Sequence, residues 1–180
     1  MNQMKSLFNF SLKFIIIIGL VCLFLVFSTL LYFSSSLPDY KKLSTYQPPV
    51  SSRVYSQNGT LIAEYAIEKR LFIPYDAIPK KVINAFLSAE DKNFFNHPGI
   101  DAKGIIRATI KNLKNIASNK RLEGASTITQ QVAKNFLLTN EISFRRKIKE
   151  AILAFRIEKA YSKERILELY LNQIYLGEGT

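Results

Sequence analysis

The hydrophobic residues of this chain follow three different patterns. An uncharged apolar run, FIIIIGLVCLFLVFSTLLYF, covers residues 14–33 and has about the 20 residues needed to cross a bilayer core. Two short stretches with β-branched and aromatic residues flank Asn58-Gly59, a strong local signal for a β-hairpin. From Pro79 onward, apolar residues recur every three or four positions. The chain is therefore predicted to be mainly α-helical, with a small β-hairpin and an N-terminal transmembrane helix.

The helical region divides at polar residues that suit helix N-termini. One helix is predicted from Pro79 to Glu90-Asp91. Others are predicted after Asp101, after Ser126 or Thr127, after Ser143 and after Ser162, because such side chains cap the first backbone N–H groups. In each of four predicted helices the apolar residues share one face. In the first two these are Val82, Ile83, Phe86 and Leu87, and Ile105, Ile106, Ile110, Leu113 and Ile116. In the last two the face is predicted to point inward and consists of Ile148, Ala151, Ile152 and Phe155, and of Ile166, Leu167, Tyr170, Leu171 and Ile174.

The apolar run is predicted to stay in the protein as a membrane anchor. Lys5 and Lys13 precede it with no acidic residue beside them, which favours a cytoplasmic N-terminus, although Lys41 and Lys42 weaken the asymmetry. A cleaved signal peptide is the alternative, but the run exceeds the roughly 7–15 residues of a signal core and no Ala-x-Ala-like site follows. The predicted segments are a cytoplasmic N-terminus (1–13), the anchor (14–33), a linker (34–50), a hairpin region (51–78) and a helical domain (79–180).

The net charge and the cysteine content limit the kinds of ligand and metal site that this chain can have. The net charge is +11, and a basic domain outside the cytoplasm suits anionic lipid headgroups or a phosphate-bearing ligand rather than nucleic acid. Cys22 is the only cysteine and lies in the apolar run, which excludes disulfides within the chain and a cysteine-based metal cluster. His97 is the only histidine, which argues against zinc.

The stretch AEDKNFFNHPG, residues 89–99, places an acidic pair at the end of an apolar helix. Glu90 there would be partly shielded from water, with Phe94 and Phe95 as an apolar wall, and would be a better proton acceptor near neutral pH. From these residues alone, the favoured interpretation is that Glu90 and Asp91 end the helix and Phe94 anchors a loop. His97 is compatible with a turn residue.

Two further stretches suit a phosphate-bearing ligand. In EGASTITQQVAKN (123–135), small residues let backbone N–H groups at a helix N-terminus approach a phosphate, and Gln130 and Lys134 share a helix face. In RRKIKEAI (145–152), Arg146 and Lys147 could clamp a phosphate near Glu150. A solvated helix and an ordinary Lys147–Glu150 pair explain the same residues. A fourth stretch, SKERILELYLNQIYLG (162–177), is amphipathic and predicted to be core.

In this order, the four stretches resemble the first four signature motifs of the peptidoglycan glycosyltransferase family. The matches are Glu-Asp-x-x-Phe-x-x-His-x-Gly at 90–99, Gly-small-Ser-Thr-Ile-Thr-Gln-Gln at 124–131, Arg-Lys-x-x-Glu at 146–150 and Lys-x-x-Ile-Leu-Glu-x-Tyr-Leu-Asn-x-Ile-Tyr-x-Gly at 163–177. Ala125 replaces a frequent second glycine. The anchor and residues 48–65 also resemble the start of the bifunctional class A penicillin-binding proteins, so a fifth motif, the rest of the lobe and a transpeptidase domain are expected beyond Thr180.

The resemblance implies a lysozyme-like glycosyltransferase lobe, of which this chain holds the front part, with a membrane-dipping region near the loops after the first motif. It implies polymerisation of lipid II into glycan strands, by inverting transfer from a polyprenyl pyrophosphate donor to a GlcNAc 4-hydroxyl. The protein is then expected in the bacterial cytoplasmic membrane, crossing it once, with its catalytic domain outside the cytoplasm. The expected partners are lipid II, a lipid-linked glycan chain, the membrane and other cell-wall synthesis proteins, without nucleic acid.

The resemblance also implies roles for individual residues. Glu90 is expected to be the general base and Glu150 a second catalytic glutamate that orients the site or assists the pyrophosphate, either without a metal or through a divalent cation such as Mg²⁺ or Mn²⁺. The implied substrate-binding residues are Asp91, Phe94, His97, Gly99, Gly124, Ser126, Thr127, Gln130, Gln131, Lys134, Arg146 and Lys147.

Two other functions remain open at this point. A membrane-anchored lysozyme-like glycan hydrolase would share a glutamate after a helix, but it would not need the basic third motif or the anchor. The chain could also be an inactive truncated fragment of a bifunctional penicillin-binding protein.

Overall fold

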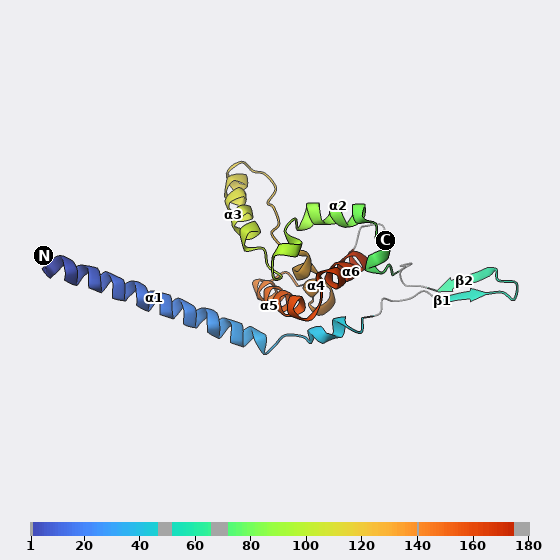
Figure 1. The fold of residues 1–180 in the computed structure, drawn as a ribbon, viewed down its shortest axis with the longest axis horizontal. Helices are drawn as coiled ribbons and strands as arrows, with labels where there is room; N and C mark the ends of the chain where they lie inside the picture. The colour runs from blue at the N-terminus through green and yellow to red at the C-terminus, as the bar shows by residue number, and fades with distance from the viewer. Residues whose placement is uncertain (1, 47–51, 66–71, 140, 175–180) are drawn as a thin grey trace. The chain divides into compact units, whose positions relative to one another are not determined.

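The computed structural model describes residues 2–46, 52–65, 72–139 and 141–174 (Figure 1). The chain divides into two units, Met1–Leu37 and Pro38–Thr180, which are described separately. The first unit is built on helix α1 (Asn2–Ser34), in which Lys13–Ser34 form a 22-residue stretch apolar and long enough to cross a membrane. The predicted N-terminal apolar helix is therefore confirmed.

The predicted β-hairpin is also present. Strands β1 (Ser52–Tyr55) and β2 (Leu61–Tyr65) pair antiparallel, with Arg53 opposite Glu64 and 2.8 Å between Arg53 Nε and Glu64 Oε1. The connecting turn contains Gly59 at φ +81°, a backbone conformation that glycine adopts without strain. The Asn58-Gly59 signal thus marks the turn.

The second unit is mainly helical, as predicted. Thr127, Ser143 and Ser162 each accept a hydrogen bond from the backbone N–H three residues later, at 3.2, 3.1 and 3.3 Å, and Asp101 accepts one from Gly104 at 2.9 Å. The sequence prediction of these caps is confirmed, with Thr127 rather than Ser126 before the fourth helix. The helices are α2 (Lys80–Glu90), α3 (Ala102–Ala117), α4 (Ile128–Leu137), α5 (Phe144–Ala160) and α6 (Lys163–Gln173), with short 3₁₀ turns at Tyr40–Leu43, Tyr75–Ala77 and Phe94–Asn96.

The core of this unit lies where α4 packs against both α5 and α6 (Figure 1). Buried apolar side chains of these three helices interdigitate, and their removal from water is the main favourable term in folding. They are Ile128, Val132 and Ala133 of α4; Leu153, Ala154 and Ile157 of α5; and Ile166, Leu167, Leu169 and Tyr170 of α6.

Helix α5 buries a different face from the one predicted. Leu153, Ala154 and Ile157 are fully buried, whereas Phe155 is 42% exposed and the other residues predicted inward are only half-buried. The face that is buried also carries Glu150, which is 2% exposed. A charged residue at the start of the stripe hides its apolar periodicity, so the sequence pattern favoured the neighbouring face.

Residues 38–46, here called the docked segment, belong to the stretch predicted as a linker (34–50) and are packed against the helices. Leu43 is 1% exposed, and its carbonyl oxygen accepts a hydrogen bond from Arg165 Nη2 at 3.3 Å. The Tyr161 hydroxyl donates to the Tyr40 carbonyl oxygen at 3.1 Å. The ring of Tyr46 meets Phe136 edge-on, with ring centroids 4.6 Å apart. The chain that follows the anchor is therefore part of the helical unit.

Replacing Leu43 by alanine should destabilise the helical unit by about 2–5 kcal/mol, because truncating a fully buried leucine leaves a cavity. The measurement is the free energy of unfolding by urea in detergent. Leu122→Ala is the matched control, since Leu122 is 56% exposed. Equal effects of the two substitutions would show that the docked segment does not stabilise the unit.

Candidate active site

Glu90 occupies the last turn of α2, where its carboxylate meets α4. Glu90 Oε2 accepts a hydrogen bond from Gln131 Nε2 at 2.9 Å. The side chain is exposed, contrary to the partial shielding predicted from the sequence. The reason is that Phe94 turns into the core at 0% exposure and Phe95 is half-exposed, so neither forms an apolar wall around the carboxylate.

A cavity of about 460 Å³, here called the cation-lined cavity, lies beside Glu90. Residues of the first three motifs meet there although they are far apart in the chain. The sequence-predicted residues that line it are Glu90, Gly124, Ser126, Gln130, Gln131, Lys134, Arg146, Lys147 and Glu150.

Glu150 holds two cations at the wall of this cavity. Its carboxylate is 2% exposed, with Oε1 3.0 Å from Arg146 Nε and Oε2 2.8 Å from Lys147 Nζ. Lys147 Nζ also donates to Ser126 Oγ at 2.7 Å. The Lys147–Glu150 pair predicted from the sequence is therefore present, and Arg146 and Lys147 line the cavity. The phosphate clamp stays a prediction. With Lys134, the positive charges outnumber the negative ones, which suits a phosphate-bearing ligand.

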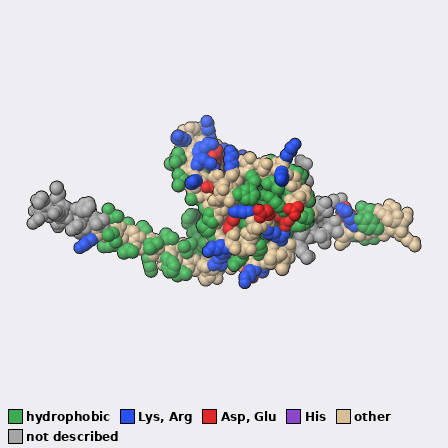
Figure 2. Space-filling model, viewed as in Figure 1, with side chains coloured by type: hydrophobic (Ala, Val, Ile, Leu, Met, Phe, Trp, Pro, Cys, Tyr) green, Lys and Arg blue, Asp and Glu red, His purple; other side chains and the backbone are tan. Residues whose placement is uncertain are grey.

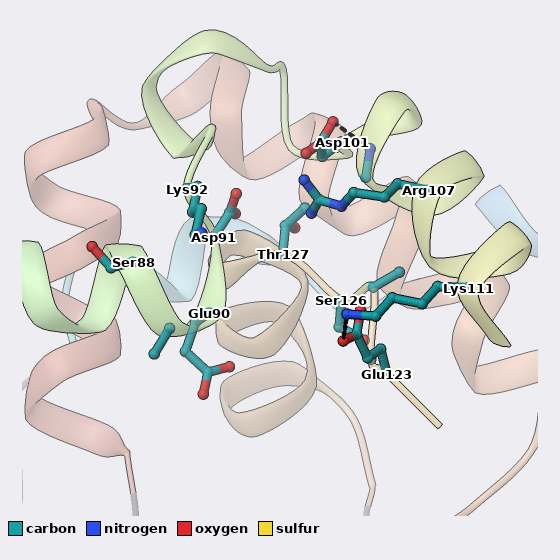
Figure 3. Close-up of a pocket in the computed structure, with 14 residues that line it drawn as sticks. Ser88, Glu90, Asp91, Lys92, Asp101, Arg107, Lys111, Glu123, Ser126 and Thr127 are labelled. Carbon is teal, nitrogen blue, oxygen red and sulfur yellow. Dashed lines mark hydrogen bonds and ion pairs between the residues drawn. The ribbon is translucent and has the colours of Figure 1, made fainter. Parts of the chain in front are cut away.

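A second cavity of about 540 Å³, here called the α3-side cavity, also reaches Glu90 (Figure 3). Arg107 extends into it from α3, and Lys111 is ion-paired with Glu123 across its edge. Asp101 lines the same cavity. Its pKa is lowered chiefly by the hydrogen bond from the Gly104 backbone N–H, and next by the one from the Asn93 side-chain amide. Arg107, Lys111 and Glu123 were not singled out in the sequence. The spacing of the two cations by one helical turn is the signal that could have indicated them.

Asp91 and His97 form a buried pair behind Glu90. His97 Nε2 lies 3.0 Å from the Asp91 carboxylate, and His97 Nδ1 accepts a hydrogen bond from the Gly99 N–H at 3.1 Å. Because Nδ1 is an acceptor, the ring proton lies on Nε2 and is donated to Asp91. Asp91 also accepts from the Ile128 N–H at 3.1 Å, which ties the loop to the N-terminus of α4.

Gly99 and Thr127 extend this network between the loop and α4. Thr127 Oγ1 donates to the Gly99 carbonyl oxygen at 2.6 Å, and Thr127 and Gln130 form a reciprocal capping box. On the other side, Lys163 Nζ donates to the His97 carbonyl oxygen at 2.7 Å. We call Asp91, His97, Gly99, Thr127 and Lys163 the loop–helix network. It fixes the end of α2, which carries Glu90, against α4, which carries Gln131.

The convergence of the motifs agrees with comparisons to known proteins. The family model described as Transglycosylase matches residues 58–180. The chain belongs to the transglycosylase family. It is 53% identical over 175 residues to Penicillin-binding protein 1A of Rickettsia bellii, covering 97% of this chain and 22% of the relative. It is 48% identical over 164 residues to Penicillin-binding protein 1A of Aquifex aeolicus, covering 91% of this chain and 22% of that relative. It is 50% identical over 147 residues to Penicillin-binding protein 1A of Pseudomonas aeruginosa, covering 82% of this chain and 18% of that relative.

This transglycosylase chain thus spans 22% or less of the length of these relatives. The resemblance to the glycosyltransferases of class A penicillin-binding proteins is confirmed at the level of the family. Three predicted substrate-binding residues of the transglycosylase, Phe94, His97 and Gly99, line neither of the two cavities. Their contact with substrate stays a prediction, and the contacts observed are internal. Lys163, which holds His97, and Tyr170 are matched positions of the fourth motif, but neither of them was predicted from the sequence to belong to the site.

A metal site is not evident in the transglycosylase lobe. Within the described residues, no three His, Cys, Asp or Glu side chains lie together as metal ligands. Glu90 and Glu150 are the carboxylates that line the cation-lined cavity. Glu150 already pairs with Arg146 and Lys147, whose charges would oppose a bound cation. These residues do not fit a divalent ion held by the protein, and the mechanism below uses none.

Proposed function

We propose that this chain carries the catalytic residues of a peptidoglycan glycosyltransferase that polymerises lipid II into glycan strands. The observation that supports it is the cation-lined cavity, which Glu90 lines together with Glu150, Arg146 and Lys147. A proton acceptor and a set of cations around one cavity suit the transfer of a sugar from a pyrophosphate leaving group. The mechanism proposed here uses no divalent cation, because Glu150 already pairs with Arg146 and Lys147.

Glu90 is the general base in this proposal. Its carboxylate takes the proton from the 4-hydroxyl of the acceptor's GlcNAc, and the oxygen attacks the anomeric carbon of the donor's MurNAc. The new glycosidic bond forms with inversion as the bond to the phosphate oxygen breaks, and its electron pair leaves with the polyprenyl pyrophosphate. The logic is that of an inverting glycosidase with a sugar hydroxyl in place of water. Exposure of Glu90 leaves it accessible to the acceptor.

The leaving pyrophosphate needs positive charge rather than a proton. Lys134, Arg146 and Lys147 line the cation-lined cavity and are the groups proposed to offset that charge. Glu150 holds Arg146 and Lys147 in place, so it acts in this proposal through the two cations. The acceptor then enters the α3-side cavity, so that Glu90 lies between the two substrates.

The exposed apolar face of helix α3 supports the proposal that the site works at a membrane surface. Ile106, Ile110, Leu113 and Ile116 are 62%, 53%, 66% and 66% exposed, so its apolar stripe is not packed in the core. Lys and Arg side chains gather around this helix (Figure 2). An amphipathic helix with cations beside an apolar face suits an anionic membrane surface. With the N-terminal apolar helix, this supports a single-pass protein of the bacterial cytoplasmic membrane that works on a lipid-linked substrate.

The products separate this proposal from the hydrolase alternative. A chimera in which this chain replaces the matching segment of the Rickettsia bellii relative should be given labelled lipid II and, separately, preformed glycan strands. We expect strands to be built from lipid II and the preformed strands to keep their length. Shortening of the preformed strands without any synthesis would support a hydrolase instead.

Lys147→Ala should raise the KM for lipid II roughly tenfold in this chimera, because a hydrogen bond to a charged group contributes about 1.5–3 kcal/mol. Steady-state kinetics of lipid II consumption provide the measurement. Lys159→Ala is the matched control, since Lys159 is an exposed lysine on the same helix and lines neither cavity. If Lys147→Ala leaves the KM and kcat unchanged, Lys147 does not bind the phosphate.

A further inference from the structure

Tyr170 of α6 is a buried tyrosine with an unpaired hydroxyl. It is 1% exposed, and its hydroxyl oxygen has no hydrogen-bond partner in the described part of the chain. Two other tyrosines of the helical unit are paired, since the Tyr46 hydroxyl donates to Gln173 Oε1 at 2.8 Å and that of Tyr161 to the Tyr40 carbonyl oxygen at 3.1 Å. A buried polar group without a partner is destabilising, and therefore uncommon. Phenylalanine would fill the same space without this cost, so the hydroxyl calls for a role.

Tyr170 contacts the helices that hold the reacting carboxylate and its hydrogen-bond donor. Its ring meets that of Phe86 edge-on, with centroids 6.1 Å apart, and Phe86 lies one turn before Glu90 on α2. Helix α6 also packs against α4, which carries Gln131. Gln131 Nε2 donates to Glu90 Oε2 at 2.9 Å. Tyr170 therefore contacts the helix that carries Glu90 and belongs to a helix packed against the one that carries Gln131.

The electrostatics of the phenol agree with this location. Burial raises the pKa of Tyr170 and the negative charge of Glu90 raises it further, whereas the Gln131 side chain lowers it as a hydrogen-bonding neighbour. The phenol therefore stays neutral at physiological pH and keeps its proton. A neutral phenol can donate to the carbonyl oxygen of the Gln131 amide, while the NH₂ group of that amide donates to Glu90. This arrangement gives the buried hydroxyl a partner and leaves the carboxylate ionised.

We propose that Tyr170 is a positioning residue for Glu90 that acts through Gln131. Its hydroxyl orients the Gln131 amide, so that the NH₂ group faces the carboxylate and holds it at the boundary of the two cavities. No proton moves to or from Tyr170. The inference rests on the proposed role of Glu90 as the base, and adds to it a residue of the fourth motif.

The link can be tested without turnover. We would label glutamine side chains with ¹⁵N in the whole 180-residue chain in detergent, and assign the Gln131 NH₂ resonances with a Gln131→Leu variant. Tyr170→Phe should shift these resonances and speed their exchange with water, while lowering the thermal midpoint no more than Tyr161→Phe does. Tyr161→Phe, the matched control, should lower the midpoint and leave the Gln131 resonances in place. Gln131 resonances that Tyr170→Phe does not move would overturn the proposal.

Kinetics of the chimera separate positioning from a structural role. Tyr170→Phe should lower kcat roughly 3- to 10-fold with the KM for lipid II unchanged, as expected for one lost hydrogen bond that orients the base. An unchanged kcat would overturn the proposal even if the resonances shift. Polymerisation that survives Glu90→Gln would instead remove the proposed function, so the two failures can be told apart.

Discussion

Replacing Glu90 by glutamine should lower glycan polymerisation by roughly 10²–10⁴-fold, the usual contribution of general base catalysis. Glutamine matches glutamate in size but cannot accept a proton from the acceptor hydroxyl. Folding should be retained, because Glu90 is exposed and its hydrogen-bond partner, the Gln131 amide, can also donate to an amide oxygen. The loss is therefore expected in kcat rather than in stability.

Initial rates of lipid II consumption by the chimera measure this effect, with circular dichroism to verify folding. Glu164→Gln is the matched control, because Glu164 is an exposed glutamate of α6 that lines neither cavity. The control should retain the full rate. Near-normal synthesis by the Glu90→Gln variant would show that another group takes the proton.

Gly99→Ala is expected to disrupt the loop–helix network and destabilise the whole helical unit. Gly99 has φ +99°, and a Cβ built there would lie 2.8 Å from both the carbonyl carbon and the carbonyl oxygen of Ala154. Strain at such a φ contributes roughly 1–3 kcal/mol. The overlap with the α5 backbone adds to it, because that backbone is part of the core and cannot move as a flexible side chain would. Displacing Gly99 also breaks the hydrogen bond from Thr127.

Urea unfolding of the chain in detergent measures this loss. Gly59→Ala controls for strain alone, since Gly59 also has a positive φ, +81°, but nothing lies within 4 Å of its added Cβ. Gly99→Ala should lower the free energy of unfolding of the helical unit far more than Gly59→Ala does. Equal stability of the two variants would mean that the close approach of Gly99 to α5 is not a structural requirement.

Local features of the fold were predictable because they depend on neighbours in the chain. Asp101, Thr127, Ser143 and Ser162 cap helices through backbone groups three residues away, so their spacing alone indicates where helices begin. The turn at Gly59 is local in the same sense.

Long-range burial was not predictable in this way. The buried face of α5 includes Glu150, and a glutamate is buried there only because Arg146 and Lys147 pair with it. The docked segment has no helical periodicity, and its packing depends on Tyr161 and Arg165, more than a hundred residues away. The apolar stripe of α3 looks like a core face in the sequence, yet most of it is exposed.

The sequence predicted which residues belong to the candidate site better than it predicted how they are arranged in space. The motifs indicated the residues that line the cation-lined cavity, because their order and spacing resemble those of the family's signature motifs. They did not indicate that His97 and Gly99 face inward, since that follows from contacts with Asp91 and Ala154. Tyr170 belongs to the fourth motif, but no role at the site was predicted for it, because a tyrosine in an amphipathic helix is most simply a core residue.

The most direct test of the account is the chemistry of the bond that forms. Lipid II labelled in the sugar and in the lipid should be given to the chimera, and both the released lipid and the configuration of the new linkage determined. Inverting transfer predicts β-linked strands and one polyprenyl pyrophosphate released for each linkage made. Release of free sugar ends without new linkages, or strands that keep the α configuration, would contradict it.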